Sequence, residues 1–250
     1  MSKSRIEQAA DLLAAAKHTV VFSGAGISME SGIPPFRGPG GLWNHYDPSC
    51  IDMDRFLREP RICWKLIKEI FYDFFGQAKP NPAHYGIGEW ERLGLVKTVI
   101  TQNIDNLHQE AGSLNVLEFH GTSRTCSCQK CGKVREVTPV MLQQDLPLCE
   151  CLGVLKPDFV FFGEGIPAKV SELSFREAAL TDLLLVIGTT GEVMPACRIP
   201  FLVQARGVKI IEINPNKTAF SDTITDIHIQ DRAGTAVKAL HKMLDSRSRL

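Results

Sequence analysis

The sequence has no excess of charge of either sign, so nothing in its composition favours a nucleic-acid or anionic-membrane partner. Lys plus Arg and Asp plus Glu each number 28 among 250 residues, giving a formal net charge of zero. Long hydrophobic runs are also missing, because no segment approaches the roughly 20 apolar residues of a membrane span. Near the N-terminus, Asp11, Lys17 and His18 interrupt the apolar stretch, so we expect no signal-peptide core. These absences predict a cytoplasmic protein.

Internal repeats and low-complexity segments are absent too, and short apolar runs instead alternate with helical patterns. The apolar runs predict strands at 19–22, 96–101, 116–119, 159–162, 183–187, 208–213 and 227–229. The helical patterns cover 6–16, 55–75 (helical after Pro60), 82–93, 167–180, 195–206 and 233–245. Strands that are apolar throughout are typical of a parallel sheet covered on both faces. The sequence therefore predicts an α/β fold.

The first predicted strand runs into a glycine turn, Ser23-Gly24-Ala25-Gly26. Glycines at this place let backbone amides approach a pyrophosphate. The turn by itself leaves dinucleotide binding and a plain tight turn about equally supported. A loop rich in glycine and proline follows, and its Arg37 suits either phosphate and ribose oxygens or a surface salt bridge.

Polar residues follow two further strands at their carboxyl ends, where open α/β sheets bind ligands. Gln102, Asn103 and Asp105 come directly after the strand at 96–101. Asp105 could equally cap a short helix that starts near residue 106. His120 ends the next strand, and a histidine there is a candidate general base, although a lone histidine is more often structural.

Five of the eight cysteines fall between residues 126 and 151. Cys128 and Cys131 form a C-x₂-C pair, and Cys149 and Cys151 form a C-x-C pair. Four thiolates from two such pairs suit a tetrahedral structural zinc, with a redox pair as the alternative. Cys126 is a fifth candidate.

Several segments together resemble one family, the sirtuins, in the family's own order over residues 20–235. The matching segments are GAGISMESGIPPFRG (24–38), TQNIDNLHQEAG (101–112), LEFHG (117–121), the paired cysteines, LKPDFVFFGE (155–164), GTTGEVMPA (188–196) and EINPNKT (212–218). The resemblance implies one catalytic unit over 1–250, with a Rossmann-like parallel-sheet domain at 18–120 and 155–245. A small zinc-binding domain is inserted at 121–154, with a helical part near 30–80.

The resemblance also implies roles for individual residues. His120 matches the general base, and Asn103 is assigned with it to catalysis. The matches for NAD binding are Ala25, Gly26, Met29, Phe36, Arg37, Gln102, Ile104, Asp105, Gly188, Thr189, Thr190, Asn214 and Asp231. The matches for the substrate cleft are Val160, Gly163 and Val193. Cys128, Cys131, Cys149 and Cys151 match the ligands of one structural Zn²⁺, which leaves Cys126 as a bystander.

The implied activity is NAD-dependent removal of acyl groups from lysine side chains of a protein or peptide. The acyl group passes to ADP-ribose and nicotinamide is released, so NAD is consumed. The alternatives are mono-ADP-ribosyl transfer, an NAD-dependent dehydrogenase, and a zinc-ribbon interaction module or NAD sensor. The sequence indicates no particular oligomeric state.

The sequence departs from the family pattern at a few positions. Pro35 stands where Asp is usual before Phe-Arg, and Gly191-Glu192 adds a negative charge near the peptide cleft. The branch of the family that removes acidic acyl groups carries a Tyr-x-x-Arg pair, and Lys68 and Phe71 occupy the corresponding positions. An uncharged acyl group is therefore expected.

Overall fold

A six-stranded parallel sheet forms the centre of the chain in the computed structural model, which describes residues 3–36 and 40–247. The strands are β1 (Thr19–Ser23), β2 (Val96–Thr101), β3 (Val116–Glu118), β7 (Leu183–Ile187), β8 (Lys209–Ile213) and β9 (Ile227–Ile229). Their order is β3-β2-β1-β7-β8-β9. The order reverses between β1 and β7, so the carboxyl ends of these two strands flank a crevice where such sheets bind ligands. The predicted Rossmann-like fold is confirmed.

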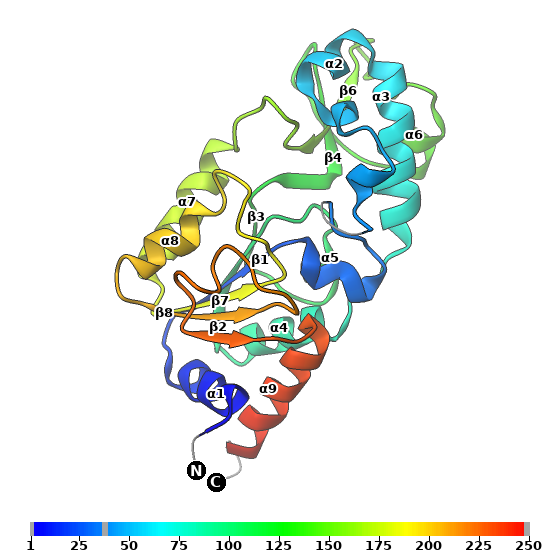
Figure 1. Cartoon of the computed structure of the whole chain (residues 1–250). Coiled ribbons are helices and arrows are strands. Elements are labelled where there is room, and N and C mark those ends of the chain that lie inside the picture. The colour runs from blue at the N-terminus through cyan, green and yellow to red at the C-terminus, as the bar shows by residue number, and fades with distance from the viewer. Residues whose placement is uncertain (1–2, 37–39, 248–250) are drawn as a thin grey trace.

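Helices cover both faces of this sheet (Figure 1). One face packs against α1 (Arg5–Ala15), α4 (Pro82–Arg92) and α9 (Ala233–Arg247), and the other against α7 (Ala168–Leu180) and α8 (Arg198–Gln204). Strand β1 shows why the middle of such a strand is continuously apolar. Val21 belongs to the core on the α1 side, whereas Val20 and Phe22 belong to the core on the α7 side. Because successive side chains of a strand point to opposite faces, both sets are buried.

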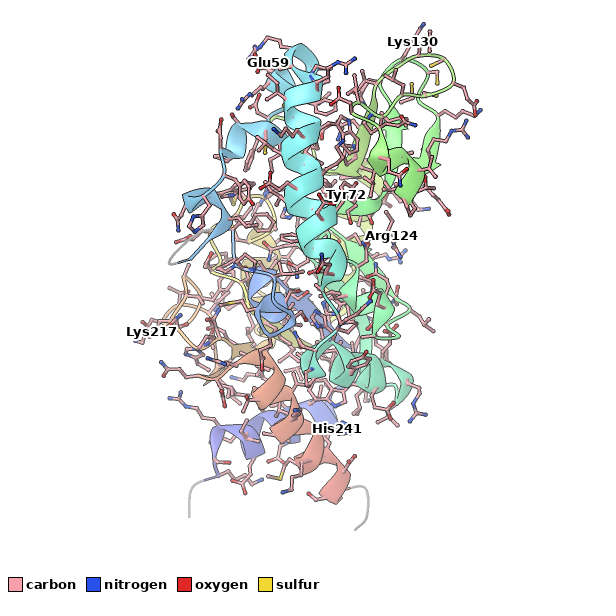
Figure 2. All side chains as sticks on the ribbon, turned by 90° about the vertical axis from the view of Figure 1, so that its right-hand side faces the viewer. Glu59, Tyr72, Arg124, Lys130, Lys217 and His241 are labelled. Carbon is pink, nitrogen blue, oxygen red and sulfur yellow. The ribbon has the colours of Figure 1, made fainter. Side chains whose placement is uncertain are left out.

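A second, smaller unit lies beside this sheet and contains the five cysteines between residues 126 and 151. Its antiparallel sheet has the order β5-β4-β6, with β4 (Gly121–Cys128), β5 (Val134–Glu136) and β6 (Leu155–Phe159). A long helical segment runs alongside it in Figure 2, where Tyr72 is labelled, and the Tyr72 hydroxyl donates to the carbonyl oxygen of Ser123 at 3.0 Å. The remaining elements are η1 (Ala25–Ser31), η2 (Leu42–Asn44), η3 (Pro48–Ile51), α2 (Met53–Arg58), α3 (Pro60–Ile67), η4 (Lys68–Phe74), η5 (Phe75–Gln77), α5 (Leu107–Glu110) and α6 (Pro139–Gln143).

The predicted strand at 159–162 was wrong. Strand β6 ends at Phe159 and pairs with β4 in the second sheet. Beyond it, the amide of Phe162 donates to the carbonyl oxygen of Ile51, so this run is tied to the helical part of the second unit. The side chains of Phe159 and Phe161 are buried in the core of that unit and not in that of the parallel sheet, whereas Phe162 is exposed. We therefore propose that the zinc-binding insert extends to residue 159, beyond the expected boundary at 154.

The stretch 55–75, predicted to be helical after Pro60, contains three helical segments: α2 before Pro60, and α3 and η4 from Pro60 onward. Glu59 has φ −133° and ψ 55°, which ends α2 and lets α3 begin at Pro60. Proline disfavours the helical conformation in the residue before it, which accounts for the break. The segment then continues as a π-helix over η4. Within the described residues, no helix is long and apolar enough to cross a membrane.

Candidate functional site

The glycine turn after β1 packs directly on the loop after β7. The amide of Gly26 donates to the carbonyl oxygen of Gly188 at 2.7 Å. A Cβ added to Gly26 would lie 2.7 Å from the Cα of Gly188, and Gly188 itself has φ 64°. Side chains at these two positions would separate the loops, so the close approach requires glycine.

Three polar side chains meet beside this turn. The hydroxyl of Ser28 donates to Oδ2 of Asp105 at 2.6 Å. Nδ2 of Asn103 donates to both, at 3.1 Å to Ser28 Oγ and 3.2 Å to Asp105 Oδ2. Burial raises the pKa of Asp105, and its hydrogen bonds from Ser28, from the amide of Leu107 and from Asn103 act in the opposite direction. The amide of Leu107 donates to Oδ1 of Asp105 at 3.1 Å, so Asp105 also caps α5.

His120 lies just beyond β3, two residues after the strand ends. Its Nδ1 atom is 3.0 Å from the carbonyl oxygen of Gln102. A carbonyl oxygen can only accept, so Nδ1 carries the proton and the lone pair is on Nε2. Burial lowers the pKa of His120, and the bond to Gln102 offsets part of that effect. The ring is therefore neutral at pH 7 with Nε2 able to accept a proton.

Gly121 brings the second unit against His120. Its φ is 75°, and a Cβ there would lie 2.1 Å from the carbonyl oxygen of Asp158. The amide of Val160 donates to the carbonyl oxygen of His120 at 2.8 Å. Of the predicted substrate residues, Val160 is thus adjacent to the histidine. Gly163 lies in the next turn with φ 91°, and Val193 lies between β7 and α8, where its carbonyl accepts from Cys197.

Thr189 joins three of the predicted cofactor segments. Its hydroxyl accepts from Nε2 of Gln102 at 3.1 Å, and its carbonyl accepts from Nδ2 of Asn214 at 3.3 Å. Thr190 is exposed, and its carbonyl oxygen accepts from the amide of Ala219. The loops after β1, β2, β7 and β8 therefore converge at one edge of the sheet.

The other predicted cofactor residues lie around this convergence. Ala25 begins η1 and Met29 lies on it with its side chain 51% exposed, while Asp231 follows β9. Ile104 is buried in the same apolar cluster as Phe36, whose ring is 5.5 Å from that of Trp43. The position of Arg37 lies outside the described residues.

The four predicted zinc ligands form one cluster. The sulfur atoms of Cys128, Cys131, Cys149 and Cys151 all lie within 4.8 Å of one another, with 3.5 Å between Cys128 and Cys151. Ligands about 2.3 Å from a tetrahedral zinc have sulfur atoms a little under 4 Å apart, so the set fits this ion. The backbone amides of Cys131 and Lys130 donate to Cys128 and help lower its pKa to about 6, which favours the thiolate. Cys126 is buried and outside the cluster.

The family is decided by comparison with known proteins. The Sir2 family profile matches residues 24–195, which is well over half of the chain. The chain belongs to the Sir2 family. NAD-dependent protein deacylase 2 of Pyrobaculum aerophilum is 44% identical to this Sir2 protein over 245 residues, covering 96% of each chain.

Solved Sir2 structures share the fold over nearly the whole length. A Sir2 homologue in complex with NAD has a TM-score of 0.89 at 38% identity, covering 96% of this chain and 94% of that one. A Sir2 variant with a deacetylated p53 peptide and 3′-O-acetyl ADP-ribose also has a TM-score of 0.89, at 34% identity, covering 96% of this chain and 98% of that one.

The sequence analysis missed three residues of this Sir2 site. Ser28 was passed over although it follows the glycine turn, and His84 although it is the third residue of α4. His84 lies 3.4 Å from the Ser28 hydroxyl, and burial lowers its pKa to about 4. His108 lies below the site, with Nε2 2.9 Å from the hydroxyl of Ser23. Serine and histidine have common structural uses, so only the contacts of Ser28 with Asp105, of His84 with Ser28 and of His108 with Ser23 distinguish them.

Proposed function

We propose that this Sir2 protein is an NAD-dependent protein lysine deacylase that transfers the acyl group to ADP-ribose. The observation that carries the proposal is His120, neutral and with the lone pair on Nε2, at the edge of the sheet that holds the Asn103–Asp105–Ser28 cluster. The deacylases among its relatives and the complex with acetyl ADP-ribose support the same activity.

The glycine turn and the loops after β2, β7 and β8 would hold NAD. The backbone at the start of η1 would approach the NAD phosphates closely, because the Gly26–Gly188 contact keeps side chains away. Asn103 and Asp105 would orient the ribose and nicotinamide, since Ser28 fixes the Asp105 carboxyl group. Bound NAD supplies the ribose to which the acyl group is transferred while nicotinamide leaves.

His120 would act on a proton in this reaction. Nε2 would accept it from a ribose hydroxyl, while Nδ1 stays bonded to Gln102. That bond holds the ring in one orientation, so the base needs no rearrangement before the proton moves.

The acyl-lysine peptide would lie along Val160, Gly163 and Val193, beside His120. We expect it to carry an uncharged acyl group. Lys68 donates through Nζ to the carbonyl oxygen of Gln144 at 2.6 Å, so its charge is already engaged in the second unit. The ring of Phe71 is buried and lies 4.9 Å from that of Phe159, in an apolar cluster.

One zinc held by the four cysteines would stabilise the second unit and take no part in bond making. A Cβ added to Gly153 would lie 2.6 Å from the sulfur of Cys128, so the backbone wraps closely around the ligands. The proposal includes a cytoplasmic location, because clustered free thiols suit a reducing compartment.

The test is incubation of the purified protein with NAD and an acetyl-lysine peptide, with nicotinamide release and peptide mass followed together. We expect NAD-dependent loss of the acetyl mass, abolished in His120→Ala. NAD-derived mass appearing on protein without deacylation would instead establish mono-ADP-ribosyl transfer. Absorbance from NADH would indicate a dehydrogenase.

A further inference from the structure

Glu212 on β8 is a buried carboxylate with three hydroxyl partners. Its side chain is 1% exposed. Oε1 accepts from Thr218 at 2.5 Å and Ser221 at 3.0 Å, and Oε2 accepts from Thr225 at 2.7 Å. Across residues 3–36 and 40–247, no lysine, arginine or histidine forms a salt bridge with it. A buried carboxylate needs hydrogen bonds in place of water, so the three hydroxyls compensate its burial together.

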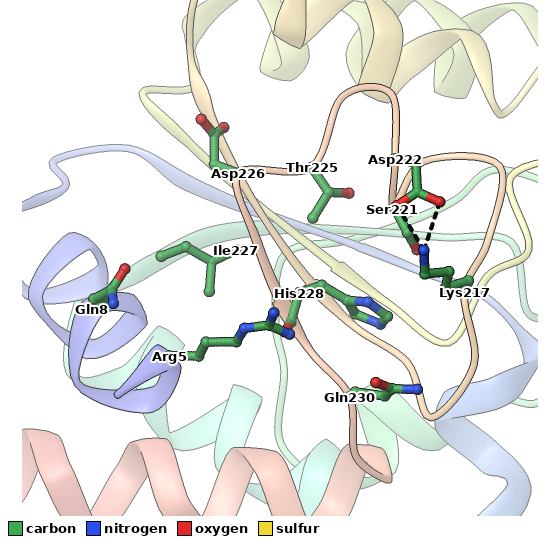
Figure 3. Close-up of a pocket in the computed structure, with 10 residues that line it drawn as sticks. All are labelled: Arg5, Gln8, Lys217, Ser221, Asp222, Thr225, Asp226, Ile227, His228 and Gln230. Atoms are coloured by element: carbon green, nitrogen blue, oxygen red, sulfur yellow. Dashed lines mark hydrogen bonds and ion pairs between the residues drawn. The ribbon is translucent and has the colours of Figure 1, made fainter. Parts of the chain in front are cut away.

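All three hydroxyls come from the loop 214–226 between β8 and β9. We call Glu212, Thr218, Ser221 and Thr225 the hydroxyl clamp. The outer side of the loop borders a surface hollow of about 380 Å³ (Figure 3), where Lys217 forms an exposed ion pair with Asp222. Exposed pairs contribute little to stability, so the clamp is the stronger anchor of this loop.

The inner side of the same loop supports the segment 189–191 of the cofactor site. The amide of Ala219, next to Thr218, donates to the carbonyl oxygen of Thr190 at 3.0 Å. The ring of Phe220 is fully buried, and a Cβ added to Gly191 would lie 2.8 Å from it. At the start of the loop, Asn214 donates to the carbonyl oxygen of Thr189. The loop therefore contacts three consecutive residues of the cofactor segment.

We infer that Glu212 is a positioning residue for NAD binding, acting through the clamp and this loop without touching the cofactor. The inference rests on the proposed function, because it assigns the 189–191 segment to the NAD site. When a hydroxyl of the clamp is removed, the loop loses part of its anchor. The Thr189–Gly191 segment then occupies more than one position relative to Gly26. Because only one of these positions binds NAD, the apparent affinity falls with the population of that position.

The experiment measures ADP-ribose affinity by calorimetry, together with the unfolding midpoint, in single variants. Thr218→Val and Thr225→Val each remove one clamp hydroxyl. Thr223→Val is the matched control, because this hydroxyl belongs to the same loop but donates to the carbonyl oxygens of Ala219 and Phe220 instead of to Glu212. Thr218→Ser keeps the clamp hydroxyl.

We expect Thr218→Val and Thr225→Val to weaken ADP-ribose binding at least about fivefold, because binding must then order a loop that has lost a hydrogen bond to a charged group. Thr223→Val and Thr218→Ser should bind within about twofold of the unaltered protein. If Thr218→Val does not fold, Thr225→Val and the serine variant carry the comparison.

Unchanged affinity in folded Thr218→Val and Thr225→Val, with only a lower unfolding midpoint, would overturn the inference and leave Glu212 a purely structural residue. Equal weakening in Thr223→Val would overturn it as well. If the unaltered protein binds neither ADP-ribose nor NAD, the proposed function fails and the inference falls with it. This result differs from failure of the inference alone, in which the unaltered protein binds ADP-ribose and the clamp variants bind it equally well.

Discussion

The Nδ1 atom of His120 lies 3.0 Å from the carbonyl oxygen of Gln102, and this one contact decides which ring nitrogen acts as the base. Gln102 directly follows β2, and His120 lies just past β3, the neighbouring strand. The parallel pairing of these strands thus sets the tautomer of the histidine. A residue's chemistry follows here from the register of a sheet.

The pH dependence of the reaction should reflect this histidine. Because burial lowers the pKa of His120, the neutral form persists below the usual histidine value of about 6.5. We expect the acidic limb of kcat/KM for the acetyl-lysine peptide to lie below that pH. Circular dichroism at each pH separates loss of activity from unfolding. An acidic limb above pH 7 would contradict the assignment.

Removing the Ser28 hydroxyl should impair NAD use. Ser28→Ala deletes the 2.6 Å hydrogen bond to Asp105, which now helps to keep the pKa of that carboxyl group down. We expect kcat/KM for NAD to fall about tenfold or more. Ser31→Ala is the control, because the Ser31 hydroxyl accepts from Asn81 and is not bonded to Asp105. A similar loss in both variants would mean that η1 has simply been destabilised.

Zinc content should distinguish Cys131 from Cys126. Cys131→Ala removes a member of the four-sulfur cluster, whereas Cys126→Ala leaves all four in place. Metal analysis should find about one zinc per chain in Cys126→Ala and much less in Cys131→Ala, which should also lose activity as the second unit unfolds. Loss of zinc from Cys126→Ala would show that the ligand set is different.

Gly26→Ala should abolish tight NAD binding. The new Cβ would lie 2.7 Å from the Cα of Gly188, so the two loops must separate. Overpacking of this kind costs about 1–3 kcal/mol, which corresponds to roughly fivefold to a hundredfold or more in affinity. Gly165→Ala is a matched control, because no atom lies within 4 Å of its added Cβ. The affinity of each variant for NAD is measured by calorimetric titration. Equal NAD affinities in Gly26→Ala and Gly165→Ala would show that NAD binding does not depend on the Gly26–Gly188 contact.

Stability should fall as the pH drops below about 6.5, the usual pKa of an unfolded histidine. Burial lowers the pKa of His84 to about 4 and that of His108 well below its usual value. The unfolded chain then binds more protons than the folded one, so acid favours unfolding. Each group contributes up to about 1.4 kcal/mol per pH unit in this window.

The matching variant is His108→Gln, which keeps a donor for the Ser23 hydroxyl. Denaturant unfolding between pH 5 and 6.5 should show a shallower pH dependence in the variant than in the unaltered protein. Equal slopes would mean that His108 binds protons equally in the folded and unfolded chains, so that burial does not lower its pKa.

The parallel sheet could be predicted because its strands are buried on both faces. Strands at 96–101 and 183–187 were predicted at their observed bounds. Their β-branched and leucine side chains are buried on whichever face of the sheet they point to. The places of Asn103, Asp105 and His120 at the carboxyl edge followed from their positions after predicted strands, whereas the roles predicted for them came from the family resemblance. At these residues the strand ends predicted from the sequence coincide with the carboxyl edge of the observed sheet.

The apolar run at 159–162 could not be placed, because apolarity does not say which core a segment joins. Its backbone pairs with His120 and Ile51, which are far away in sequence. Glu212 was missed for a related reason. A glutamate inside a predicted strand gives no sign that three hydroxyls from a later loop will surround it.

The most direct test of the central claim is the product ratio in the first minutes of reaction, measured by mass spectrometry with an acetyl-lysine peptide and NAD. The proposed deacylase should form one O-acetyl-ADP-ribose and one nicotinamide for each acetyl-lysine that is deacetylated. Deacetylated peptide that accumulates without NAD, or NAD-derived mass retained on protein in place of acetyl-ADP-ribose, would contradict it.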